Sequence, residues 1–218
     1  DKYFKNNVGS LENIIYEIQK LKKPMNFIFS SSCTVYGQAD SMPINEGFEL
    51  KKAESPYGQS KRKCEEILEN FHKTGHNFKN ITLRYFNPIG AHPTSLIGEL
   101  PIGIPENLVP YITQTAVGKR DHLTVFGDDY DTNDGTCVRD YIHIMDLAEV
   151  HITCLEKLMN IKDDSFFNVY NVGTGKGTSV LELINLFENV NKLKLNYKIG
   201  KRRDGDVVTA YADTSKIK

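Results

Sequence analysis

A tyrosine and a lysine four residues apart, Tyr57 and Lys61, carry the chemistry that is easiest to state from this sequence. On a helix this spacing places both side chains on one face, about one turn apart. A nearby ammonium favours the phenolate, and it lowers the pKa of a free phenol, about 10, toward the range in which a general base works. Ser55 and Pro56 suit the N-cap and the first position of a helix. The pair therefore predicts a tyrosine that removes a proton from an alcohol.

Spacing alone is a weak signal, because Tyr16 with Lys20 and Tyr197 with Lys201 share it. An amphipathic helix with a solvated lysine explains any such pair equally simply. Only Tyr57 follows an apolar run that leads directly into serines.

That run, residues 25–32, is continuous rather than alternating, which predicts a buried strand of a parallel sheet. Ligands of open α/β sheets gather at the carboxyl ends of strands, where Ser30 to Thr34, including Ser32 and Cys33, would lie.

The elements that must position these residues alternate between strands and helices. The helix that begins near Tyr57 is expected to end at Gly75, and a second strand is expected over 81–86. A strand, a helix and a strand form the crossover unit of a doubly wound sheet, which residues 167–172 could rejoin. Further helices are expected over 1–23, 111–118, 146–158 and 180–190, and short strands over 123–127 and 195–199.

Composition excludes several classes of function. The chain has 218 residues, a net charge of −1, 39% hydrophobic residues and 25% charged residues. This composition is typical of a protein with an ordinary soluble core, and it does not indicate a nucleic-acid-binding or membrane-binding surface. The four cysteines form no CxxC and the six histidines no HExxH. We therefore expect reduced thiols, a cytoplasmic location and no metal.

Several motifs together carry a resemblance to a known family. Ser32, Tyr57 and Lys61, with the segments 84–88 and 138–143, closely resemble UDP-glucose 4-epimerases of the extended short-chain dehydrogenase/reductase superfamily. The blocks 104–111 and 202–206 resemble those of nucleotide-sugar members, and the resemblance runs from about Asn6 to Lys218.

The resemblance implies an α/β fold, namely the C-terminal part of a doubly wound Rossmann-like parallel sheet with a smaller α/β substrate-binding domain. We expect residues 1–91 and 141–176 to belong to the NAD-binding domain, and residues 92–140 and 177–218 to belong to the substrate-binding domain. The family also implies a homodimer, built partly from the helices around Leu11 and Ile67.

The ends of the sequence predict an internal fragment of a longer protein. Its first residues have the pattern of a helix that has already begun, and Ser215 to Lys218 have the pattern of the start of a helix. The family's glycine-rich turn, which holds a dinucleotide pyrophosphate at a helix N-terminus, is not in the sequence. Gly173 to Gly177 is the only glycine cluster, and it resembles a later turn of the family. We expect the 218 residues alone to bind free NAD poorly.

The resemblance implies one reaction, the interconversion of UDP-glucose and UDP-galactose. Tyr57 would remove the proton of the sugar 4-hydroxyl while hydride passes from C4 to NAD, and hydride would return to the other face after the 4-keto sugar turns over. Ser32 would bind the 4-oxygen and relay its proton, and Lys61 would hold the nicotinamide ribose and keep the phenol acidic. Asn7, Tyr85 and Phe86 match the family's cofactor contacts, although Phe86 could equally be core and Asn7 a surface amide.

UDP recognition would fall on Asn87, Asn107, Leu108, Phe126, Arg139, Tyr141, Arg203 and Asp206, with Ser32, Cys33, Thr34 and Tyr57 beside the sugar. Arg139 and Arg203 can each offer a bidentate fork to a diphosphate, and Phe126 can lie against the uracil. His92 and His143 suit structural hydrogen bonds better than acid/base work.

Ala210 resembles the family's gatekeeper beside the sugar 2-substituent, and its small size predicts room for the N-acetyl group of UDP-N-acetylglucosamine and UDP-N-acetylgalactosamine. A one-residue change of register would instead point Tyr211 into the pocket, because side chains alternate along a strand.

Two other functions remain open. A nucleotide-sugar 4,6-dehydratase would need an added acid/base carboxyl pair, and residues 31–36 contain no Asp or Glu. A noncatalytic redox-sensing or scaffold relative would keep the fold without turnover, which an intact Ser32, Tyr57 and Lys61 set disfavours.

Overall fold

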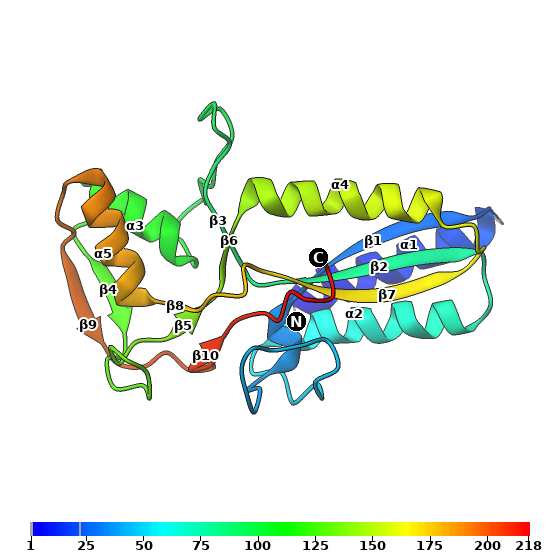
Figure 1. Cartoon of the computed structure of the whole chain (residues 1–218), viewed down its shortest axis with the longest axis horizontal. Coiled ribbons are helices and arrows are strands. Elements are labelled where there is room, and N and C mark those ends of the chain that lie inside the picture. The colour runs from blue at the N-terminus through cyan, green and yellow to red at the C-terminus, as the bar shows by residue number, and fades with distance from the viewer. Residues whose placement is uncertain (1, 22) are drawn as a thin grey trace.

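The computed structural model describes residues 2–21 and 23–218, and it shows an elongated molecule with two lobes (Figure 1). The larger lobe, which we call the sheet lobe, contains a π-helix η1 (Phe4–Val8), α1 (Gly9–Leu21), β1 (Met25–Ser32), a 3-10 helix η2 (Cys33–Tyr36), α2 (Pro56–Lys73), β2 (Phe78–Tyr85), β3 (Asn87–Ile89), β6 (Tyr141–His143), α4 (Ile144–Asn160) and β7 (Phe166–Val172). The smaller lobe contains α3 (Leu108–Ala116), β4 (Leu123–Phe126), β5 (Val138–Arg139), β8 (Thr178–Ser179), α5 (Val180–Asn191), β9 (Tyr197–Gly200) and β10 (Thr209–Ala210).

The main sheet has the strand order β1-β2-β7, and both pairings are parallel. Ser32 lies opposite Tyr85, and Tyr85 lies opposite Val172, so the three carboxyl ends are level. The α/β fold class and the return of the third strand to the sheet are confirmed. The division of the chain at residues 91, 140 and 176 stays a prediction.

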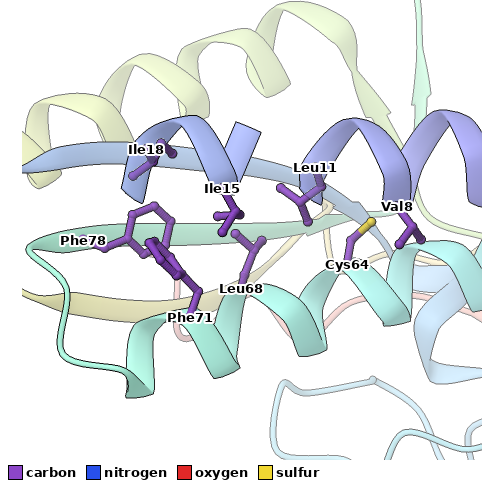
Figure 2. Close-up of a cluster of buried hydrophobic side chains, with 8 residues drawn as sticks. All are labelled: Val8, Leu11, Ile15, Ile18, Cys64, Leu68, Phe71 and Phe78. Carbon is purple, nitrogen blue, oxygen red and sulfur yellow. The ribbon is translucent and has the colours of Figure 1, made fainter. Parts of the chain in front are cut away.

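Helices cover both faces of this sheet, with α1 and α2 on one side and α4 on the other (Figure 1). Figure 2 shows the first of the two cores, formed by Val8, Leu11, Ile15, Ile18, Cys64, Leu68, Phe71 and Phe78. The second core lies under α4 and contains Ile81, Leu83, Ile142, Leu147, Cys154, Leu158, Tyr170 and Val172. Alternation along β2 explains the two cores, because Phe78 faces α2 while Ile81 and Leu83 face α4.

The start of α2 agrees with its predicted capping residues. Ser55 is the N-cap, its side chain accepts a hydrogen bond from the Gly58 N–H at 3.1 Å, and Pro56 occupies the first turn. At the other end Gly75 has a φ of +79°, which suits the end of a helix. These two ends fix where Tyr57 and Lys61 lie along the helix.

Three elements differ from the sequence-based expectations. The helix predicted over 1–23 is interrupted, because η1 precedes α1 with the Gly9 N–H bonded to the Phe4 carbonyl; residues 1 and 22 of that prediction lie outside the described residues. β2 begins at Phe78 rather than 81, with Asn80 buried and bonded to Thr82 at 2.9 Å. α3 begins at Leu108 rather than 111.

The smaller lobe has its own core of Ile112, Leu123, Val125, Ile184 and Leu195. α5 begins with a capping box, in which the Ser179 side chain accepts from the Glu182 N–H and Glu182 accepts from the Ser179 N–H. Among the described residues, no helix is long and apolar enough to cross a membrane.

Candidate active site

Ser32 ends β1 and lies 7% exposed at the carboxyl edge of the sheet. It also caps the 3-10 helix, since its Oγ accepts hydrogen bonds from the Thr34 N–H at 3.3 Å and the Thr34 hydroxyl at 3.0 Å. Burial raises the pKa of the neighbouring Cys33 thiol to about 11. Burial therefore favours the thiol form of Cys33 over the thiolate.

Tyr57 lies in the first turn of α2. Burial raises the pKa of Tyr57 to about 12, and hydrogen bonding with the Ser32 side chain only partly opposes this rise. The Lys61 Nζ lies 5.7 Å from the centre of the Tyr57 ring and donates to the Ser30 carbonyl at 2.9 Å. The predicted lowering of the Tyr57 pKa by Lys61 is wrong in this structure, because burial of the phenol dominates.

The other two tyrosine–lysine pairs lie away from the carboxyl ends of the main sheet's strands. Tyr16 is 58% exposed on α1, and Lys20 lies 3.8 Å over its ring while pairing with Glu17. Tyr197 belongs to β9 rather than to a helix. Position at a strand end therefore separates Tyr57 from the two pairs of equal spacing.

The predicted cofactor contacts lie around the same strand ends. The Asn7 amide donates to Ser60 of α2 at 2.9 Å, and Tyr85 lies level with Ser32 on the adjacent strand. Phe86 is 4% exposed and belongs to a buried apolar cluster. A role for these three residues at a cofactor stays a prediction.

A cavity of about 490 Å³ begins beyond the end of β2 and reaches into the smaller lobe. All eight residues predicted to recognise UDP line it: Asn87, Asn107, Leu108, Phe126, Arg139, Tyr141, Arg203 and Asp206. Its lining also includes Glu106 of the block 104–111, together with Glu99, Cys137 and Val180, which sequence reasoning did not single out. Residues separated by more than 100 positions thus meet in one concave site of ligand-binding size.

Two arginines in this cavity share one carboxylate. Arg203 contacts Asp206 at 2.7 Å, and Arg139 lies 3.6 Å from the same carboxyl group. The Arg203 guanidinium also lies 5.7 Å from the centre of the Phe126 ring. Arg202 instead pairs with Asp129 at 2.7 Å, so only one of the two adjacent arginines faces the cavity.

Ala210 is 6% exposed and packs in a cluster with Phe86, Val35 and Tyr36 rather than lining the cavity. Cys33 packs against the same cluster, and a role for Ala210 beside the sugar stays a prediction. The Tyr211 ring packs beside Gly177 and, like Ala210, does not line the cavity.

The glycine cluster after β7 binds a carboxylate of the chain itself. The buried Asp140 side chain accepts hydrogen bonds from the Thr174 N–H at 2.8 Å, the Gly175 N–H at 3.0 Å and the Ala212 N–H at 3.1 Å. A Cβ on Gly173 would lie 2.4 Å from this carboxylate. The turn is therefore occupied internally and does not fit a pyrophosphate.

Other predicted polar residues have structural partners. His143 caps α4 by accepting from the Met145 N–H at 3.1 Å, and His92 bonds to Thr94 at 2.7 Å, as expected. Within residues 2–21 and 23–218, no group of three or more His, Cys, Asp or Glu side chains could hold a metal ion.

Sequence reasoning missed a buried ion pair directly below Ser32. Arg84 of β2 donates to Glu65 of α2 through Nε at 3.0 Å and Nη2 at 2.5 Å, and both residues are nearly fully buried. Glu65 follows Lys61 by four residues, so the same helical spacing that selected Tyr57 and Lys61 could have found it.

Comparison with known proteins places this geometry in a family. The sequence profile of the NAD dependent epimerase/dehydratase family matches residues 1–173. The chain belongs to this family. A UDP-glucose 4-epimerase of Haemophilus influenzae is 48% identical over 214 residues, covering 98% of this chain and 62% of that protein.

Solved structures of family members share the fold. A UDP-glucose 4-epimerase of Bifidobacterium longum in complex with NAD+ and UDP has a TM-score of 0.92 and 44% identity, covering 99% of this chain and 63% of that one. A second, from Stenotrophomonas maltophila with bound NAD and formylated UDP-arabinopyranose, has a TM-score of 0.92 and 43% identity, covering 99% and 62%. The chain spans a little over three fifths of the length of these relatives.

Proposed function

We propose that the protein containing this chain is an NAD-dependent epimerase that interconverts UDP-glucose and UDP-galactose. The observation that carries the proposal is the continuity of two sites. Ser32 and Tyr57 lie at the level of Tyr85, and the arginine-containing cavity begins at Asn87, two residues further along the chain. A UDP group in the cavity would place its sugar at the hydroxyl groups of Ser32 and Tyr57.

Proton transfer falls to Tyr57 and Ser32. Ser32 binds the sugar 4-oxygen and passes its proton to the Tyr57 phenolate, and the protonated phenol returns a proton to the same oxygen in the second half of the reaction. Burial raises the pKa of Tyr57, and hydrogen bonding with Ser32 opposes this rise, which acts in favour of the phenolate that the first half needs. One tyrosine acts as base and then as acid, so no proton is consumed.

The residues at the strand ends fit the nicotinamide ribose of NAD. Lys61 has a half-buried ammonium whose pKa burial lowers, and it lies beside Tyr57 where it can donate to ribose hydroxyls. Asn7 and Tyr85 flank the same place. These residues would hold NAD with its nicotinamide at the sugar, where the cofactor would supply the hydride acceptor and donor for chemistry at C4.

Nucleotide binding falls to the cavity. Arg139 and Arg203 face the diphosphate, Phe126 lies against the uracil, and Asn107 and Leu108 close the far end. A planar guanidinium can bind phosphate oxygens with two parallel hydrogen bonds, which fixes the orientation of the nucleotide. Ala210 supports a broader substrate range that includes the N-acetylated UDP-sugars.

The alternative of a 4,6-dehydratase lacks chemical support at the site. Elimination of water needs an acid/base carboxyl group beside the sugar, but Glu65, the carboxylate that contacts Ser31 next to Ser32, is held by Arg84 and Ser31.

We also propose that the enzyme is a cytoplasmic homodimer that uses the outer face of α1. Leu11, expected at the interface, is 3% exposed and belongs to the core of the protomer. Ile14 and Leu21 flank this buried row on α1 and are 44% and 53% exposed. These two residues, rather than Leu11, would meet a second copy.

The role of Tyr57 is tested by Tyr57→Phe in the NAD-loaded holoenzyme, with Tyr16→Phe as the matched control. We expect kcat for UDP-galactose to fall by about 10²–10⁴-fold in Tyr57→Phe, because the acid/base group is lost. UDP affinity, measured by calorimetry, should stay unchanged because Tyr57 does not line the nucleotide cavity. A Tyr57→Phe enzyme that turns over as fast as Tyr16→Phe would exclude this role.

A further inference from the structure

Three consecutive serines at the end of β1 each contact a different residue of α2. The pairs are Lys61 with the Ser30 carbonyl at 2.9 Å, Glu65 with the Ser31 hydroxyl, and Tyr57 with Ser32. The three α2 residues are four positions apart, so they form one stripe along the helix. This stripe sets the position of α2 along β1.

The middle contact belongs to a buried ion pair. Glu65 is 7% exposed and Arg84 is 5% exposed, and the Arg84 Nε and Nη2 atoms both donate to the carboxylate. Ser31 lies opposite Arg84 in the sheet register and is fully buried. The pair therefore joins α2 to β1 and β2 at one point, one residue before Ser32.

The same pair also holds the segment that follows Ser32. The Arg84 guanidinium lies 4.8 Å from the centre of the Tyr36 ring, and the Tyr36 hydroxyl donates to Asn171 of β7 at 2.7 Å. The Asn171 amide in turn donates to the Ile44 carbonyl at 2.8 Å. Ser32 thus lies between two fixed points, Ser31 before it and Tyr36 after it.

Burial of two charges is a poor source of stability, because desolvation offsets much of their attraction. We propose that Glu65 and Arg84 are positioning residues that hold Ser32 and Tyr57 at hydrogen-bonding distance for proton transfer. This inference rests on the proposed epimerase reaction. A misplacement of about 1 Å between reacting groups can cost on the order of 10²-fold in rate, so the pair acts on kcat.

Two variants of the holoenzyme test this role. Arg84→Lys keeps the charge but loses the two-point contact with Glu65. The triple variant Ser31→Ala, Glu65→Leu, Arg84→Met removes the polar set and leaves neither an unpaired buried charge nor an unpaired hydroxyl. Glu188→Gln is the control, because it weakens an ion pair with Lys194 and a bond to the Leu195 N–H in the distant α5.

We expect kcat to fall about 10-fold or more in Arg84→Lys and in the triple variant, with KM for UDP-galactose within about twofold of the wild type. Glu188→Gln should change the unfolding midpoint without changing kcat. An Arg84→Lys enzyme that is folded and keeps the wild-type kcat would overturn the proposal, whatever the triple variant does.

A second readout separates this proposal from the proposed function. The ¹³Cζ resonance of Tyr57, assigned with Tyr57→Phe, reports its hydrogen bond with Ser32 at neutral pH without any turnover. It should move in Arg84→Lys and stay in place in Glu188→Gln. If the wild type epimerises no UDP-sugar, the proposed reaction is wrong, and the change in the Tyr57 resonance still tests the positioning role. If the resonance is the same in Arg84→Lys and in the wild type, the positioning role is wrong.

Discussion

Asp206 neutralises much of the positive charge that Arg139 and Arg203 bring to the nucleotide cavity. Its carboxylate lies 2.7 Å from one guanidinium and 3.6 Å from the other. A diphosphate that enters the cavity competes with this carboxylate for both guanidinium groups. Asp206 therefore keeps the arginines oriented before binding, when two unpaired guanidinium groups would repel each other.

Ala210 carries the prediction about substrate range. Ala210→Tyr should abolish turnover of UDP-N-acetylgalactosamine while turnover of UDP-galactose stays within a fewfold, because the added ring clashes only with the larger substituent. The measurement is kcat/KM for both sugar pairs before and after the change. Equal loss on both pairs would show that residue 210 acts as core next to Phe86, and a wild type inactive on the N-acetyl pair would exclude the broader range.

Residue types and spacing were sufficient to select Tyr57, because the serine-rich strand end and the capping residues Ser55 and Pro56 are local signals. The raised pKa of Tyr57 could not be predicted in this way, because it depends first on burial of the phenol and then on charge interactions with Tyr85, Cys33 and Tyr3, all of which require the fold. The same holds for Glu65 and Arg84, whose partners lie on different elements.

At the scale of elements, α1 shows how two apolar stripes on one helix differ in role. Leu11, Ile15 and Ile18 face the sheet lobe's core, whereas Ile14 and Leu21 face outward. The sequence predicted one apolar face. A spacing of three or four residues does not say which of two overlapping apolar stripes is buried in the core of the protomer and which stays exposed. The start of the helix could not be predicted either, because the π-turn of η1 has no sequence signal of its own.

The two stripes predict opposite outcomes for two substitutions in α1. Ile14→Glu should weaken self-association of the holoenzyme in sedimentation equilibrium without lowering its unfolding midpoint. Leu11→Ala should instead lower the free energy of unfolding by about 2–5 kcal/mol, the usual cost of a cavity in a core. A monomeric wild type, or an Ile14→Glu dimer as tight as the wild type, would contradict the proposed interface.

At the scale of the whole molecule, Asp140 joins the two lobes. Its carboxylate binds the turn after β7 in the sheet lobe and the Ala212 N–H beyond β10, while its neighbours Arg139 and Tyr141 line the cavity. The sheet lobe could be predicted strand by strand from local patterns. The cavity could be assembled only from the family resemblance, because its residues come from segments more than 100 positions apart.

The most direct test of the proposed reaction follows a deuterium atom placed at C4 of UDP-galactose. The NAD-loaded holoenzyme should produce UDP-glucose that keeps the deuterium at C4, because the hydride leaves C4 and returns to C4 without exchange with water. Proton and deuterium NMR of the product measure this directly. Loss of the label to water, elimination across C5 and C6, or recovery of unchanged UDP-galactose would each contradict the proposed epimerase.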